Sequence, residues 1–361
     1  MTRAKKKSTK IAFQDALVMM SPGTKLRDAI FAILQSRNGA IICIGDTKRL
    51  ADISEGGVTL DEPLKPQLLY ELSKMDGAII LNEDASRILY ANRFLKPQET
   101  IPSDETGTRH RAAERVARQA KCMVVAVSER RASVTLYVGD TKHVLDSIPT
   151  LLNKATQAIQ TLEKYINSLN QATTDLGARE FEDMVTIFDV CKTIQRYEMV
   201  VRIKREIDPY ILELGTEGRL IAMQLKELII PLDDAELVIK DYYRERQGVD
   251  YETVKRRISE ISQQDLLNLG NISQALGFGA NLKTIDTYLS PRGYRLLWLT
   301  RRLTPQVIES LVQRFGTIQH IMRAPKEELV EVEGVGEVLA ERVRQSLNGL
   351  RNQLAFDRNR R

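Results

Sequence analysis

Hydrophobic and polar positions change their spacing twice along this chain of 361 residues. In the first part of the chain, short apolar runs bounded by glycine or polar residues alternate with segments in which apolar residues recur every three or four positions. The runs are typical of strands, and because several are apolar at nearly every position, we expect central strands covered on both faces. These runs lie at 39–45, 77–81, 87–91, 121–127 and 134–138.

Helical segments separate the predicted strands, and they lie at 24–37, 64–75 and 112–120. Thr24 can cap the first of them through its hydroxyl, and Leu26 and Ile30 share its apolar face. Since helices and strands alternate, we predict an α/β domain with a mixed sheet over 12–148, preceded by a basic flexible arm at 1–11.

The middle of the chain has a helical pattern. Apolar residues recur at spacings of three and four over 152–169, and a second stripe continues over 184–195. Helical periodicity persists to about residue 280, with breaks expected at Gly177, Pro209, Gly215 and Pro231. We predict an all-α linker and oligomerisation region at 149–290, in which the stripes form core or helix–helix contacts rather than a ligand site.

The last part of the chain combines short helices with an excess of positive charge. The helices are predicted at about 305–314, 317–323, 326–331 and 337–351. Residues 291–361 contain 13 Lys and Arg against 8 Asp and Glu, so the whole net charge of +5 lies there. That excess places any surface for a polyanion in a small all-α domain at 291–361.

Composition argues against several classes of protein. No apolar run approaches the roughly 18–20 residues that span a bilayer, and the basic N-terminus lacks the apolar segment of a secretory signal. Three histidines are too few and too scattered for an ordinary zinc site. The three cysteines each lie in an apolar run, which favours buried free thiols in a reducing compartment. We therefore expect a cytoplasmic protein with no membrane partner.

A basic helix start is the first candidate site. The segment 106–111, Thr-Gly-Thr-Arg-His-Arg, leads into the helix predicted at 112–120. The N-terminus of a helix is already partly positive, so cations placed there are unfavourable unless an anion binds among them. Gly107 would let the backbone approach that anion closely. A triphosphate fits this pattern, and so does a solvated helix start with Gly107 as a turn residue.

Asp76 offers complementary chemistry at the entrance to the strand predicted at 77–81. Mg²⁺ bound to phosphates takes one or two protein carboxylates. Gly77 removes a side chain where a ribose or phosphate has to approach. An Asp-Gly turn before a strand is common, so this pair alone stays ambiguous.

Taken together, the two segments resemble a known family. Asp-Gly-Ala at 76–78 and Arg-His-Arg at 109–111 resemble the DGA and RHR motifs of diadenylate cyclase (DisA_N) domains, and the stretches 92–97 and 106–111 are similar as well. The resemblance covers about residues 12–148, without a departure at either motif. It implies that two such domains face each other with one ATP each, and that each 3′-hydroxyl attacks the other α-phosphate. The products would be cyclic di-AMP and two pyrophosphates.

The resemblance also implies roles for individual residues. Asp76 would bind Mg²⁺ or Mn²⁺ and help to activate the 3′-hydroxyl, with Arg109 and His110 as further catalytic residues. The nucleotide would contact residues from several segments of the domain: Gly77, Leu95, Thr106, Gly107, Thr108, Arg109, His110, Arg111, Ala112 and Ser128.

A glycine-rich hairpin is the candidate DNA-binding site. Gly334, Val335 and Gly336 connect the last two predicted helices, and the pattern resembles a helix-hairpin-helix motif. In that motif, backbone N–H groups and a helix N-terminus contact DNA phosphates without reading sequence. A less regular copy lies at 311–321. The alternative is an ordinary helix turn in which glycine allows compact packing.

The wider layout is similar to that of the DNA integrity scanning family over almost the whole chain. That resemblance implies a nucleoid-associated homo-oligomer, an octamer in the family, in which binding of branched or damaged DNA lowers cyclase output. Two other functions stay open: a DNA-binding scaffold whose nucleotide domain only senses ATP, and a DNA-processing subunit that hydrolyses ATP. The sequence contains no GxxxxGK[ST] loop that would support the last of these.

Overall fold

The computed structural model describes residues 12–230, 232–245, 249–300 and 303–359. Its contacts divide the chain into two compact units. The first unit is formed by Met1–Gln157 with Glu206–Met223, and the second by Ala158–Arg205 with Gln224–Arg361. The basic arm predicted at 1–11 lies outside the described residues.

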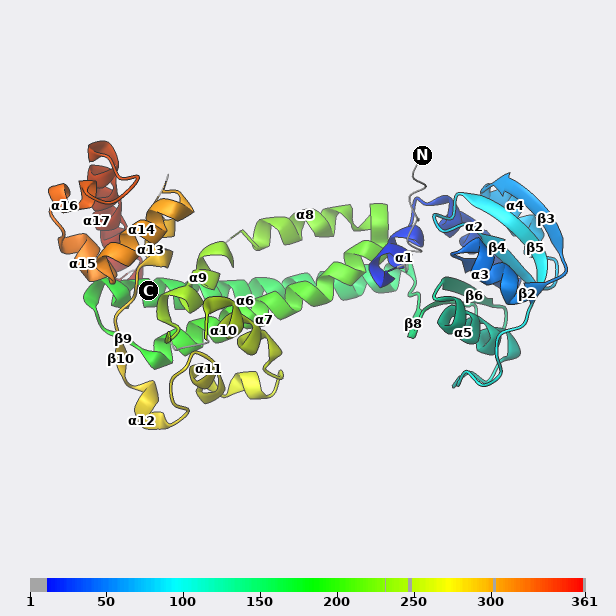
Figure 1. Cartoon of the computed structure of the whole chain (residues 1–361), viewed down its shortest axis with the longest axis horizontal. Helices are drawn as coiled ribbons and strands as arrows, with labels where there is room; N and C mark the ends of the chain where they lie inside the picture. Colours follow the sequence, from blue (N-terminus) through cyan, green and yellow to red (C-terminus); the bar gives the residue numbers. More distant parts are fainter. Residues whose placement is uncertain (1–11, 231, 246–248, 301–302, 360–361) are drawn as a thin grey trace, which may run out of the picture. The chain divides into compact units, whose positions relative to one another are not determined.

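A mixed sheet forms the centre of the first unit, with the strand order β2-β5-β4-β1-β6-β7-β8 and β3 paired to β5 (Figure 1). β1 and β4 are parallel, and the other pairs in this sheet are antiparallel. The strands are β1 (Ala40–Ile44), β2 (Ser54–Glu55), β3 (Val58–Pro63), β4 (Ala78–Leu81), β5 (Arg87–Leu95), β6 (Met123–Ser128), β7 (Ser133–Val138) and β8 (Thr141–Val144). The predicted α/β domain with a mixed sheet is confirmed.

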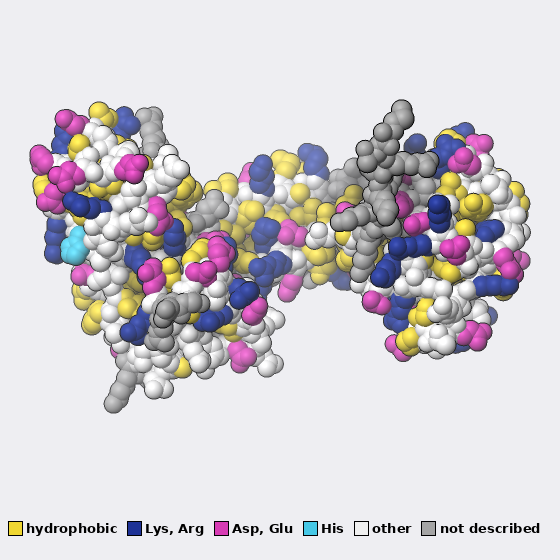
Figure 2. Space-filling view, viewed as in Figure 1, with side chains coloured by type: hydrophobic (Ala, Val, Ile, Leu, Met, Phe, Trp, Pro, Cys, Tyr) yellow, Lys and Arg dark blue, Asp and Glu magenta, His cyan; other side chains and the backbone are white. Residues whose placement is uncertain are grey.

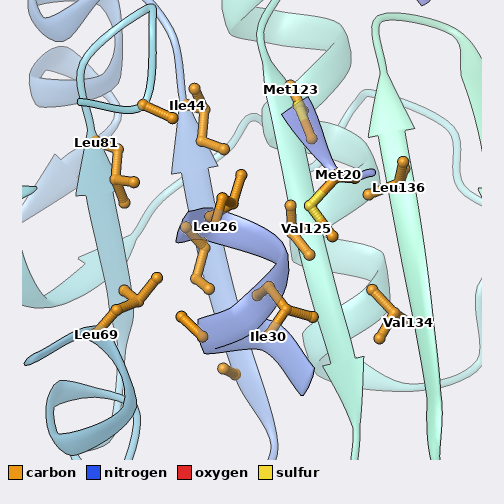
Figure 3. Close-up of a cluster of buried hydrophobic side chains, with 14 of the residues drawn as sticks. Met20, Leu26, Ile30, Ile44, Leu69, Leu81, Met123, Val125, Val134 and Leu136 are labelled. Atoms are coloured by element: carbon orange, nitrogen blue, oxygen red, sulfur yellow. The ribbon is translucent and has the colours of Figure 1, made fainter. Parts of the chain in front are cut away.

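Helices cover both faces of this sheet, and they are α1 (Phe13–Met19), α2 (Lys25–Gln35), α3 (Thr47–Asp52), α4 (Pro66–Leu72) and α5 (Thr108–Ala120). Successive side chains of β1 point to opposite faces, so Ile42 packs with Ile30 of α2 while Cys43 packs with Val116 of α5. Figure 3 shows the first of these clusters, where apolar side chains on and around α2 lie against β1, β4, β6 and β7. The central strands are therefore buried on both faces, as predicted.

Local signals fix the start of α2 as expected, whereas the edge strands escaped prediction. The Thr24 hydroxyl accepts a hydrogen bond from the Arg27 amide at 3.2 Å. β3 and β8 are mostly exposed and carry polar residues, so they lack the apolar run that marked the central strands. Their strand conformation comes from pairing with β5 and β7.

Two long helices, α6 (Ile148–Glu182) and α7 (Ile187–Leu214), contribute to both units. Two of the predicted breaks are wrong, because Gly177 lies inside α6 and Pro209 inside α7. A Cβ at Gly177 would lie 2.8 Å from the Leu354 side chain, so glycine there serves close packing rather than a turn. Buried Ile207 and Leu214 on either side of Pro209 offset its cost of about 3 kcal/mol.

The other two predicted breaks have different outcomes. Gly215, with φ of +51°, ends α7 as predicted and begins the 3₁₀ turn η1 (Gly215–Gly218). Pro231 lies outside the described residues. The remaining elements of the helical middle are α8 (Arg219–Leu228), α9 (Leu232–Tyr242), α10 (Tyr251–Glu260), η2 (Asp265–Leu267), α11 (Leu269–Ala275) and α12 (Leu282–Ile285), with β9 (Val185–Thr186) paired to β10 (Tyr288–Leu289).

The C-terminal helices lie where the sequence predicts them. They are α14 (Pro305–Phe315), α15 (Ile318–Arg323), α16 (Lys326–Val330) and α17 (Glu337–Asn359), and they share one apolar core. A short helix that the pattern did not predict, α13 (Tyr294–Trp298), joins the same core.

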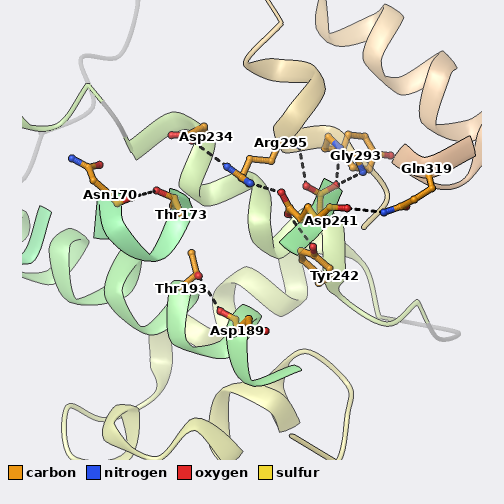
Figure 4. A network of polar contacts seen from close by, with 12 residues as sticks. Asn170, Thr173, Asp189, Thr193, Asp234, Asp241, Tyr242, Gly293, Arg295 and Gln319 are labelled. Carbon is orange, nitrogen blue, oxygen red and sulfur yellow. Dashed lines mark hydrogen bonds and ion pairs between the residues drawn. The ribbon is translucent and has the colours of Figure 1, made fainter. Parts of the chain in front are cut away.

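A buried polar network holds α13 against α6 and α9 (Figure 4). The Arg295 guanidinium forms an ion pair with Glu180, and the two side chains are 2% and 0% exposed. Asp241 accepts hydrogen bonds from the backbone amides of Gly293, Tyr294 and Arg295 at 2.6–3.0 Å, which caps the start of α13. Burial and the nearby Glu180 carboxylate raise the pKa of Asp241 to about 7, although these hydrogen bonds act to lower it.

Two expectations from composition can be compared with the described residues. Cys43, Cys122 and Cys191 are buried free thiols, as predicted, and burial raises the pKa of each. Over the part of the chain that the structure describes, no helix is both long and apolar enough to cross a membrane.

Candidate active site

A cavity of about 990 Å³ lies at one edge of the sheet in the first unit. β5 runs antiparallel to β4, and β6 runs antiparallel to β1. The ends of β5 and β6 therefore meet the starts of β4 and β1 at this edge, beside the start of α5. The volume is at the upper end of the range of about 300–1,000 Å³ that small-molecule sites occupy.

Most of the predicted site residues line this cavity: Asp76, Gly77, Leu95, Thr106, Gly107, Thr108, Arg109, His110, Ala112 and Ser128. Arg111 is placed differently, because it is not among the lining residues and its Nε donates to the Glu105 carbonyl at 3.2 Å. The structure therefore brings the two motifs together at one cavity and directs one arginine to the loop before α5.

The start of α5 presents positive charge to the cavity. Gly107 is the N-cap residue of α5, and no side-chain hydrogen bond caps the helix there. The first turn contains no acidic residue. A Cβ at Gly107 would meet only the His110 ring, at 3.9 Å, so the protein itself leaves room there for a side chain. With exposed Arg109 in the first turn, the helix dipole and the side-chain charge both favour a bound anion.

Asp76 and Gly77 lie at the same edge, before β4. Gly77 has φ of +85°, and a Cβ there would lie 2.8 Å from the Arg93 carbonyl, so the neighbouring strand already requires glycine. Among the described residues, no group of three His, Cys, Asp or Glu side chains could hold a metal ion. The Asp76 carboxylate is exposed at the cavity. A single carboxylate fits Mg²⁺ or Mn²⁺ that arrives with a nucleotide, since such ions keep water and phosphate oxygens as their other ligands.

Several cavity residues escaped the sequence analysis. Gly39 lies against the Arg109 side chain, whose Cζ would be 2.7 Å from a Cβ at this position, so glycine leaves the space that the guanidinium occupies. Phe94 is 64% exposed and offers an aromatic face at the cavity. Arg130 and Arg131 follow β6 and add two exposed cations. The Arg-Arg pair that follows Ser128 after one glutamate was a signal available in the sequence, whereas the role of Gly39 depends on the fold.

A chain of hydrogen bonds connects the His110 ring to Tyr137 and Glu105. His110 Nδ1 lies 3.0 Å from the Tyr137 hydroxyl, which donates to Glu105 at 2.8 Å. Burial lowers the pKa of His110, with nearby Arg131, Lys142 and Arg109 acting in the same direction against Glu105. The ring is therefore neutral near pH 7 in the structure as it stands.

In the second unit, Gly334, Val335 and Gly336 form the turn between α16 and α17. The Val335 side chain is buried in the helical core, and its amide donates to the Val332 carbonyl at 3.0 Å. Gly334 has φ of +84°, and a Cβ at Gly336 would meet open space. The first amides of a helix have no intrahelical acceptor, so the start of α17 offers backbone donors beside Gly336.

The second predicted copy of the hairpin is also present. Gly316, with φ of +74°, connects α14 to α15, and a Cβ there would meet open space too. Acidic and basic side chains are interspersed over the visible face of these helices (Figure 2). Ion pairs such as Arg314–Glu331 at 3.2 Å reduce the local positive field.

Comparison with known families now defines the class of protein. Residues 27–142 match the DisA bacterial checkpoint controller nucleotide-binding domain, 145–285 match the linker region of the same controllers, and 301–354 match a helix-hairpin-helix motif. The cavity lies within the first match, and both glycine turns lie within the last. The chain is thus a nucleotide-binding domain followed by a linker and a helix-hairpin-helix region.

Curated relatives identify the family. The chain is 49% identical over 342 residues to the DNA integrity scanning protein DisA of Carboxydothermus hydrogenoformans, covering 94% of this chain and 97% of that protein. It is 46% identical over 345 residues to DisA of Clostridium perfringens, with 95% and 96% covered, and 45% identical over 347 residues to DisA of Symbiobacterium thermophilum, with 96% and 98% covered. The chain belongs to the DisA family.

Proposed function

We propose that this protein is a diadenylate cyclase that converts two ATP molecules into cyclic di-AMP and two pyrophosphates. One observation carries the proposal: the Asp76 carboxylate and the basic start of α5 line a single cavity large enough for a nucleotide. A carboxylate that can orient a hydroxyl and a helix start that can hold phosphates supply two of the functions on which phosphoryl transfer depends, positioning and charge stabilisation.

In the proposed reaction, the 3′-oxygen of one ATP forms a bond to the α-phosphorus of the other. The bond from that phosphorus to the bridging oxygen breaks, and pyrophosphate leaves. Asp76 orients the attacking hydroxyl and helps to remove its proton. Arg109, His110 and the amides at the start of α5 hold the phosphates, while Phe94 offers a stacking face for the adenine.

A bound Mg²⁺ or Mn²⁺ would be held by Asp76 together with phosphate oxygens and would supply charge neutralisation at the reacting phosphate. Each chain contributes one cavity to a reaction that joins two nucleotides. We therefore propose that two copies face each other within a homo-oligomer and that a lone subunit does not turn over.

The proposal includes DNA binding by the helix-hairpin-helix region and regulation of the cyclase by branched or damaged DNA. Support comes from the two glycine turns and from the concentration of the chain's net positive charge in residues 291–361. Contacts of this kind go to phosphates, so affinity should fall as salt rises and depend little on sequence.

Product analysis tests the cyclase. The full-length protein is incubated with ATP and Mg²⁺ or Mn²⁺, and the nucleotides are separated by chromatography, beside Asp76→Asn and the matched control Asp140→Asn at an exposed turn. We expect cyclic di-AMP from the wild type and from Asp140→Asn, and none from Asp76→Asn. Intact ATP in the wild-type reaction, despite measurable ATP binding, would leave the nucleotide-sensing scaffold as the better account.

Gly336→Ala tests the DNA contact. A Cβ at Gly336 meets no protein atom within 4 Å, so the substitution leaves the fold intact while placing a methyl group beside the proposed phosphate site. We expect a severalfold weaker affinity for a branched DNA. Gly349→Ala is the control, since its Cβ also meets open space but it lies inside α17, away from the turn. Equal affinities of both variants and the wild type would exclude this turn as the contact.

A further inference from the structure

A hydrogen-bonded chain behind His110 determines which of its ring nitrogens carries a proton. Tyr137 has one hydroxyl hydrogen, which it donates to Glu105 at 2.8 Å, so its oxygen can only accept from His110 Nδ1, 3.0 Å away. Lys142 lies 2.5 Å from the same Glu105 oxygen. The proton of the neutral imidazole is therefore on Nδ1, and Nε2 presents a lone pair.

The Glu105 carboxylate stays charged at the far end of this chain. Burial acts to raise the pKa of Glu105, but the hydrogen bonds from Lys142 and Tyr137 outweigh it and hold the pKa below its ordinary value. A negative charge is thus fixed behind the imidazole, in the arrangement by which a carboxylate stabilises an imidazolium.

His110 Nε2, by contrast, has no hydrogen-bond partner among the residues that the structure describes. The atom is buried and, within the described part of the chain, accepts and donates no hydrogen bond, although its ring lines the cavity. A buried polar atom without a partner is unfavourable, and the groups that can reach it from the cavity belong to a ligand.

We propose that His110 takes up one proton at Nε2 when a nucleoside triphosphate enters the cavity, and that Glu105 and Tyr137 are positioning residues for this step. The proton comes from the buffer. Nε2–H then donates to a phosphate oxygen, while Nδ1–H continues to donate to Tyr137. The inference rests on the proposed function for the class of ligand but does not require turnover.

The groups that face His110 explain why the proton is absent without ligand. Burial opposes a charged ring most strongly, and the cations Arg131 after β6, Lys142 on β8 and Arg109 on α5 oppose it as well, against the attraction of Glu105. A triphosphate carries several negative charges and reverses this balance. Affinity should therefore be highest at low pH and fall as pH rises through the pKa of His110 in the loaded site.

Calorimetry measures the proton directly. Mg²⁺ and α,β-methylene ATP, in which the reacting phosphate link cannot be cleaved, are titrated into the full-length protein at about pH 7.5 in buffers of different ionisation enthalpy. We expect the wild type to take up close to one proton more than His110→Gln. The phosphates of the ligand also exchange protons on binding, and the titration of His110→Gln measures that contribution so that it can be subtracted.

Two further variants separate positioning from folding. Tyr137→Phe keeps the buried ring but removes the hydroxyl, and Glu105→Gln removes the charge. Each should lose at least half of the extra proton and bind the analogue about tenfold more weakly, while the protein stays folded with a melting temperature lowered only by the lost hydrogen bonds. Tyr70→Phe, on α4 and outside the cavity lining, should behave as the wild type.

Nitrogen spectra give a readout that does not depend on binding. With only three histidines in the chain, solid-state ¹⁵N spectra of the histidine-labelled protein can be assigned from single substitutions. We expect the protonated nitrogen of ligand-free His110 to be Nδ1, and a mixture of the two tautomers in Tyr137→Phe.

The outcomes distinguish this inference from the cyclase proposal. Equal proton uptake in the wild type and His110→Gln, or a proton on Nε2 of the ligand-free protein, would overturn the inference even if cyclic di-AMP is made. The expected proton uptake in a protein that makes no cyclic di-AMP would support this inference and contradict only the cyclase proposal.

Discussion

A buried network in the second unit and the cavity in the first use charged side chains in opposite ways. In the second unit, Arg295 and Glu180 are almost completely buried, and their partners are other protein groups. At the cavity of the first unit, Arg109, Arg130 and Arg131 are exposed around a helix start that has no acidic residue in its first turn. The charges of the Arg295–Glu180 network are compensated within the protein, whereas the positive charge at the cavity favours a bound anion.

The difference gives a criterion for separating structural from ligand-binding charge. A buried cation is tolerated where a carboxylate and hydrogen bonds compensate for lost hydration. Cations gathered at the positive end of a helix repel one another and are compensated by an anionic ligand. The network around Arg295 is therefore placed to stabilise the fold, and the group around Arg109 fits the phosphate site that we propose.

Breaking the buried pair should have the largest effect on stability. Glu180→Gln leaves Arg295 buried without its main countercharge, so we expect the second unit to lose about 3–5 kcal/mol of unfolding free energy. Fluorescence of Trp298, the one tryptophan of the chain, reports on this unit during denaturant unfolding because it ends α13. Glu163→Gln, exposed on the same helix α6, is the control and should change little. Equal losses in the two variants would contradict the assignment.

Moving a cavity cation should affect binding but not stability. Gly39→Ala places a Cβ where the Arg109 guanidinium lies, and a flexible side chain can shift away at little cost to the fold. Since hydrogen bonds to charged groups contribute about 1.5–3 kcal/mol, ATP affinity should fall about tenfold to hundredfold. Equilibrium binding and thermal unfolding measured on the same samples would check this, and a lower melting temperature with unchanged affinity would speak against it. Gly349→Ala is the control, because a Cβ there meets open space. Gly56→Ala is unsuitable, because φ at Gly56 is +69° and an alanine would be strained there.

The smallest effect should come from an ion pair at the surface. Arg314 and Glu331 lie 3.2 Å apart, with side chains that are 60% and 65% exposed. Because water screens such pairs, Glu331→Gln should change the unfolding free energy by less than about 1 kcal/mol. A slightly tighter affinity for DNA is expected, since one negative charge near the hairpin is removed. A loss of unfolding free energy comparable to that of Glu180→Gln would mean that side-chain exposure does not distinguish weak ion pairs from stabilising ones.

Much of the fold could be predicted because its strongest signals are local. The apolar runs of β1, β4 and β6 marked central strands, and Thr24 marked a helix start. Edge strands such as β3 form through pairing, which leaves little trace in composition. Gly177 and Pro209 were misread because packing against distant residues outweighs local preference within a long helix.

The candidate site was predictable as a set of motifs but not as a geometry. Residues around Asp76 and Arg109 could be singled out by their type, and the fold brings them to one cavity. The clearance that Gly39 gives Arg109 and the chain from His110 to Glu105 depend on segments that meet only in the folded protein. Neither leaves a pattern in the sequence.

The start of α5 also has a consequence for the dynamics of the protein. Without a side-chain cap, and with cations in its first turn, this end of the helix opens more readily than its interior. A nucleotide that compensates those charges becomes part of the folding equilibrium of the turn and stabilises it in proportion to the logarithm of its concentration. Amide hydrogens at residues 108–110 should exchange with solvent quickly in the free protein and slowly once ATP is bound. The cellular ATP level would then set the order of this helix end before any chemistry takes place.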